Sequence, residues 1–127
     1  MKNLPKKLSL IAAGLIIITG IIHIIDAPDS FGDAIYKGWL FYANGLGSFM
    51  AAYGILRGKS SWGWNLGFVI AGVSFVAYIV SRSVGLPYIP AEPDAWLEPL
   101  GVASLMVEAG FIFTFIFVKR KGPSILS

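Results

Sequence analysis

Four long apolar runs separated by short polar connections organise the chain. They cover approximately residues 8–25, 36–56, 62–82 and 97–118. An α-helix rises about 1.5 Å per residue, so each run is long enough as a helix to cross the ~30 Å hydrocarbon core of a bilayer. Short connections favour antiparallel neighbours. The pattern therefore predicts an all-α polytopic membrane protein, an antiparallel four-transmembrane-helix bundle in which residues 1–127 form a single transmembrane domain.

The third run combines a membrane-spanning length with an inward-facing stripe. Residues 62–80 contain no charged side chain. Small residues recur at four-residue spacing, which lets a neighbouring backbone come close: Gly63, Gly67 and Ala71. Polar groups that lipid cannot satisfy continue much the same face: Ser74, Tyr78 and Ser81. We therefore expect this helix to pack against the others along that stripe.

The first run follows a basic segment, residues 1–7, and its alternative interpretation is a cleaved secretory signal. The run is longer than the ~7–15 apolar residues of a signal peptide, and no clear small-residue cleavage site follows it. We therefore expect a retained span. Residues 26–33, DAPDSFGD, predict a turn-rich acidic loop after it.

Charged residues are distributed unequally between the two ends of the predicted bundle. The chain ends and the turn 57–61 carry most of the lysines and arginines, whereas the other two connections carry six of the seven acidic residues. An excess of Lys and Arg marks the cytoplasmic side of a membrane. The sequence therefore predicts a multi-pass protein of the cell membrane with its N-terminus and C-terminus cytoplasmic. Cleavage of the first run would leave the orientation of the other three spans unchanged.

Composition narrows the classes of function. Hydrophobic residues make up 56% of the chain and charged residues 13%, against ~25% charged residues in soluble domains. The net charge of +3 resides at the ends of the apolar runs rather than in a patch interleaved with aromatics, which argues against a nucleic-acid partner. The chain has no cysteine, which excludes disulfides and thiolate metal sites. It also lacks a phosphate loop, a nucleophile elbow and a dinucleotide fingerprint.

Glu108 is the only formal charge well inside a predicted span. It lies about 16 Å from Lys119 along a helix, near the bilayer centre. An isolated carboxylate is costly there, so it needs a partner, water or a proton. Polar residues at similar depth complete this intramembrane polar site: Asn44, Ser48, Ser74 and Ser104. The site indicates either proton or cation binding, or a protonated acid that hydrogen-bonds two helices together.

A second candidate site lies at the outer membrane surface. His23 and Asp26 are three residues apart, so their side chains can touch on one helix face. The further members of this outer-face site are Tyr78, Arg82 and Glu98. Imidazole and carboxylate groups suit a divalent metal, for which His23 and Asp26 are the candidate ligands. The alternative is a histidine oriented by an aspartate, without metal. No other cofactor is evident.

Arg82 is the lone arginine among the predicted outer carboxylates. We expect it to form a salt bridge between outer connections, with Glu98 or Asp26 as its partner. Binding of an anionic ligand is one alternative. A helix-end arginine that extends to the membrane interface is the other.

The segment SRSVGLP, residues 81–87, carries a resemblance together with Glu98 and Glu108. It is similar to a pattern in small prokaryotic four-helix integral membrane proteins, which share a Ser-Arg-x-x-Gly-Leu-Pro helix exit. These proteins also share an acidic residue before the last helix and a late intramembrane glutamate. The resemblance covers residues 81–108. It implies the four-helix fold and carries no activity.

Three functions are compatible with these patterns. The first, which we favour, is an accessory or structural subunit of a larger membrane complex, such as a respiratory or metal-oxidase assembly, with no catalytic activity of its own. Its partners would be the lipid bilayer and the membrane subunits of a hetero-complex, or copies of itself. The alternative is a proton or small-cation transporter or channel that uses Glu108. The third is a membrane redox or metal-binding protein that uses His23 and Asp26.

Overall fold

The computed structural model describes residues 6–58 and 61–120. These residues form four α-helices and one short 3₁₀ helix: α1 Lys6–Asp33, α2 Ile35–Arg57, α3 Trp62–Ser83, η1 Pro93–Ala95 and α4 Pro99–Arg120. The chain ends that were predicted to be cytoplasmic, residues 1–5 and 121–127, lie outside the described residues, as does Lys59 of the basic turn. The predicted all-α fold is confirmed.

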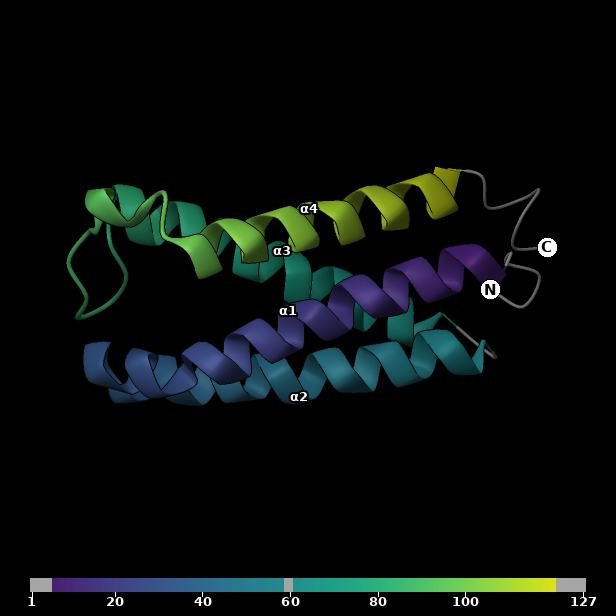
Figure 1. The fold of residues 1–127 in the computed structure, drawn as a ribbon, viewed down its shortest axis with the longest axis horizontal. Coiled ribbons are helices and arrows are strands. Elements are labelled where there is room, and N and C mark those ends of the chain that lie inside the picture. The colour runs from purple at the N-terminus through teal and green to yellow at the C-terminus, as the bar shows by residue number, and fades with distance from the viewer. Residues whose placement is uncertain (1–5, 59–60, 121–127) are drawn as a thin grey trace.

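The four helices run antiparallel to one another in sequence order (Figure 1). The most extensive packing is between α1 and α2; α2 also packs on α3, α3 on α4, and α4 returns to pack on α1. Among the described residues, α1, α3 and α4 are long and apolar enough to cross a membrane. α2 is long enough, with 23 residues, but it is less apolar than these three.

The acidic segment after the first apolar run is helical, so the turn-rich loop predicted for residues 26–33 is wrong. α1 continues to Asp33 with Pro28 inside it. A proline within a helix removes one backbone donor and crowds the preceding turn. In the same turn, the Ser30 hydroxyl donates to the Asp26 carbonyl at 3.0 Å. This extension lengthens α1 by about two turns beyond the predicted span.

A single extended residue, Ala34 (φ −166°, ψ 146°), connects α1 to α2. Two contacts hold this tight helical hairpin. The ring of Phe31 meets that of Trp39 edge to face, with centroids 5.3 Å apart. Lys37 Nζ donates to Asp33 Oδ2 at 2.6 Å. Packing therefore overrides the turn-forming preference of this sequence.

The small-residue stripe of α3 faces the inside of the bundle. Gly63, Gly67 and Ala71 are all buried. A Cβ placed on Gly63 would lie 2.6 Å from the Ile55 backbone nitrogen, so α2 and α3 touch backbone to backbone at this point. Close approach of this kind is the usual consequence of small residues at four-residue spacing.

Candidate functional site

Two residues that the sequence assigned to different sites, His23 and Glu108, meet inside the bundle. Glu108 on α4 is 1% exposed, and His23 on α1 is 8% exposed. His23 Nε2 lies 3.9 Å from Glu108 Oε2. The Ser104 hydroxyl, one turn earlier on α4, donates to the same Oε2 at 2.7 Å. The result is a buried pair of titratable side chains that links the first and last helices.

The hydrogen bonding of His23 fixes which nitrogen faces the acid. Nδ1 lies 2.8 Å from the Thr19 carbonyl oxygen, which can only accept a hydrogen bond. Nδ1 therefore carries a hydrogen, and in the neutral ring Nε2 presents its lone pair to Glu108. The ring also packs against Phe41 of α2, with centroids 4.8 Å apart. These contacts hold the imidazole in one orientation.

The other members of the predicted intramembrane site form a separate network between α2 and α3. Asn44 Nδ2 donates to Ser74 Oγ at 2.6 Å. The Ser48 hydroxyl donates to Asn44 Oδ1 at 3.2 Å. Among the described residues, no hydrogen bond joins this network to Glu108. The network ties two helices together through one amide, and the predicted site therefore divides in two.

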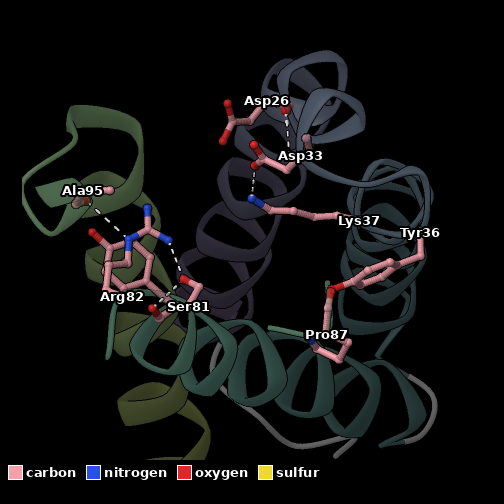
Figure 2. A network of polar contacts seen from close by, with 10 residues as sticks. Asp26, Asp33, Tyr36, Lys37, Ser81, Arg82, Pro87 and Ala95 are labelled. Carbon is pink, nitrogen blue, oxygen red and sulfur yellow. Dashed lines mark hydrogen bonds and ion pairs between the residues drawn. The ribbon is translucent and has the colours of Figure 1, made fainter. Parts of the chain in front are cut away.

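At the other predicted site, Arg82 holds the connection between α3 and α4 (Figure 2). Its Nε donates to the Ala95 carbonyl at 3.3 Å, and its Nη1 donates to Ser81 Oγ at 2.8 Å. The guanidinium also stacks 3.8 Å over the Tyr78 ring. The Tyr78 hydroxyl donates to the Trp96 carbonyl at 2.7 Å. Arg82 and Tyr78, near the end of α3, thus bind two successive backbone carbonyls of the connection to α4.

The salt bridge predicted for Arg82 is wrong, since within the described residues Arg82 pairs with neither Glu98 nor Asp26. The guanidinium instead donates to the Ala95 carbonyl of the 3₁₀ turn and to the Ser81 hydroxyl. Glu98 lines a shallow surface pocket with other residues of this connection. Figure 2 shows Asp26 on the other side of the same end of the bundle. A second tether closes this end, where the Tyr36 hydroxyl donates to the Pro87 carbonyl at 2.5 Å.

The predicted metal ligands, His23 and Asp26, gain no third ligand. No group of three or more His, Cys, Asp or Glu side chains in residues 6–58 and 61–120 is placed to hold a metal ion. Asp26 remains half-buried one turn from His23. The sequence placed His23 at the membrane surface, whereas the structure directs it to Glu108.

The sequence did not predict the pairing of His23 with Glu108, because the first helix was expected to end near residue 25. With α1 continuing to Asp33, His23 lies about 15 Å from its end. Glu108 lies about 14 Å from the beginning of α4 at Pro99. The two side chains therefore share one depth in an antiparallel pair. A first helix predicted to extend to Asp33 would have placed His23 and Glu108 at the same depth.

The fold and this site define a class: a bundle of apolar helices that is compatible with a membrane and encloses a buried His–Glu pair. Comparison of the chain with protein-family models, with curated proteins and with solved structures finds no match in any of the three. Function is therefore argued from the geometry of this chain.

Proposed function

We propose that the chain is an integral membrane protein whose four helices all span the bilayer, and that it acts as an accessory subunit of a larger membrane assembly. The length and apolar character of α1, α3 and α4 support insertion. Arg57 and Arg120 end α2 and α4 at one end of the bundle, while Asp94 lies in the connection at the other (Figure 1). By the positive-inside rule, the end with the two arginines faces the cytoplasm.

The observation that carries the subunit role is the outward face of α2. Large side chains that are between 38% and 72% exposed recur on it at alternating spacings of four and three: Ile35, Trp39, Tyr42, Leu46, Phe49, Tyr53 and Leu56. Four of these seven are aromatic, and aromatic side chains are enriched at protein interfaces. The exposed large side chains of α1 are aliphatic throughout, as lipid favours: Leu10, Ile11, Ile18, Ile21 and Ile25.

The occupant that fits this aromatic face is a transmembrane helix of another protein. α2 is the long helix that falls short of the hydropathy of a membrane span, so lipid suits it less well than it suits the other three. Tyrosine hydroxyls such as that of Tyr42 gain a hydrogen-bond partner from a neighbouring protein at depths where lipid offers none. A seam with 3.5-residue spacing also matches the packing of one helix on another.

The closed interior argues against transport by a single chain. Every fully buried side-chain nitrogen or oxygen atom in the described residues has a hydrogen-bond partner. Trp64, Phe111 and Val118 are fully buried and fill the half of the bundle that ends in the basic residues. Polar groups that are satisfied within the bundle tie helices together and leave no lining for a water path.

The test is cross-linking in the native membrane, and the cysteine-free sequence supplies a clean background. We expect Leu46→Cys on α2 to cross-link, within the membrane, to a protein that also co-purifies with the chain in mild detergent. Val73→Cys on α3, which is 63% exposed, is the matched control and should remain uncoupled from that protein. A chain recovered without a fixed partner, or equal cross-linking from both positions, would remove the proposal.

A further inference from the structure

We propose that His23 and Glu108 form one proton-binding site, filled only from the end of the bundle that carries the acidic connections. The inference is independent of the subunit role, because it concerns what the interior binds rather than what the outer face contacts. It rests on the distances at the site, on the apolar residues that close it, and on the half-buried Asp26 beside it.

The geometry requires one proton at the pair. Nδ1 of His23 donates to the Thr19 carbonyl, so the opposite nitrogen faces Glu108 Oε2 at 3.9 Å. Without a proton, a lone pair would face a carboxylate, and the buried pair would carry an unbalanced negative charge. A second proton would leave an unbalanced positive charge. An isolated charge of either sign is costly at this depth, so the site holds a single proton.

That proton resides on Glu108 beside a neutral imidazole. At 3.9 Å the two groups are too far apart for a direct hydrogen bond. An ion pair that lacks a direct hydrogen bond does not recover the cost of removing both charges from water. A neutral acid still accepts the hydrogen bond from Ser104. The filled site is therefore an uncharged contact between α1 and α4.

The groups that face the pair supply no other balancing charge. On α1 the nearest charged residue is Asp26, which acts on His23. α2 contributes the apolar ring of Phe41 at the imidazole, and α4 contributes the hydroxyl of Ser104. Beyond them lie Lys37 at the start of α2, which pairs with Asp33, and Arg82 at the end of α3, which binds the Ala95 carbonyl.

Access to the site is one-sided. Asp26 lies one turn from His23 toward the acidic end and is half-buried, so it places a carboxylate that solvent reaches within one helical turn of the imidazole. Toward the basic end, the buried Thr19 hydroxyl donates to the Leu15 carbonyl of its own helix. Beyond it, Phe111, Trp64 and Ile16 are at most 1% exposed and fill the interior with apolar surface. A proton can therefore enter by way of His23 and stop at Glu108.

The site therefore acts as a pH-sensitive contact rather than as a conducting path. When Glu108 loses its proton, the carboxylate faces the lone pair of His23 Nε2 across 3.9 Å. This repulsion weakens the contact between the first and last helices of the bundle. An alkaline shift at the acidic end would thus loosen α4 from α1.

His23 is the only histidine in the chain, so ¹⁵N-histidine labelling reports on a single imidazole through its Nδ1 and Nε2 resonances. In unmodified protein we expect the Nε2 resonance to change at the same pH at which the infrared band of a protonated carboxyl disappears. In Glu108→Gln, which keeps the side-chain size, both the carboxyl band and the pH-dependent change of the Nε2 resonance should be lost. Glu98→Gln, which alters an exposed acid of the α3–α4 connection, is the control and should retain both.

Two results would overturn the proposal. One is a His23 titration that is the same in Glu108→Gln and in unmodified protein. The other is proton flux across phosphatidylcholine vesicles that depends on Glu108, since a site filled from one side carries none. Should Glu108→Gln fail to fold, the unmodified protein still decides, because separate midpoints for the carboxyl band and the Nε2 resonance would show two independent groups.

Discussion

Replacing Gly63 by alanine is expected to cost about 3 kcal/mol of bundle stability, near the upper end of the overpacking range. The added methyl group would lie 2.6 Å from the Ile55 backbone nitrogen and 2.7 Å from the Ala51 carbonyl oxygen. Both are main-chain atoms of α2, which cannot rotate aside as a side chain would. The substitution must therefore push α2 and α3 apart along their whole contact.

Gly72, on the same helix, provides the matched control. Nothing lies within 4 Å of a Cβ built there, so Gly72→Ala should stabilise α3 by up to ~1 kcal/mol through helix propensity alone. Thermal unfolding in mild detergent, followed by tryptophan fluorescence, measures both variants, since Trp64 is fully buried. Equal effects of the two substitutions would contradict the close contact of α2 with α3.

Arg82→Ala should release the connection between α3 and α4 and lower stability by about 2 kcal/mol, in line with hydrogen bonds to a charged group plus a cation–π contact. The guanidinium donates to the Ala95 carbonyl and to Ser81, and it stacks on Tyr78. Removing the guanidinium therefore removes both hydrogen bonds and the stacking contact. Arg82→Lys would restore the charge without the planar fork and should recover only part of the loss.

The rate of proteolytic cleavage within residues 84–98 is the measurement for Arg82. We expect cleavage to accelerate at least tenfold in Arg82→Ala. A loss of ~1.4 kcal/mol in the free energy that keeps the connection closed already raises the population of its open form tenfold. Arg57→Ala is the control, because Arg57 also ends a helix and only approaches Tyr53, at 5.7 Å from the ring centroid. Cleavage at unchanged rate in Arg82→Ala would show that the connection is held by other contacts.

The helices were predictable because long apolar runs leave few alternatives to helical structure in a chain of this composition. Their ends were less predictable. Pro28 and Gly32 favour a turn locally, whereas the contact of Phe31 with Trp39 and the hydroxyl of Ser30 support a helix through the same residues. A sequence shows the local preference but not the side chain that will pack against it.

The same error displaced the candidate site. Ending the first helix near residue 25 placed His23 at the surface with Asp26, whereas two further turns place it level with Glu108. Arg82 illustrates a different limit, because one of its two acceptors is a backbone carbonyl, a group that every residue has. A pattern of charged residues indicates which carboxylates could pair with an arginine. It does not indicate which backbone carbonyls a turn will place beside that arginine.

The most direct test of the account is the sidedness of single cysteines placed in the cysteine-free chain. Asp94→Cys lies in the connection between α3 and α4, and Arg120→Cys lies at the far end of α4. In intact cells, a membrane-impermeant maleimide should react with the first and reach the second only after the membrane is permeabilised. Labelling of both positions from one side would contradict a bundle that crosses the bilayer with its acidic connections outside.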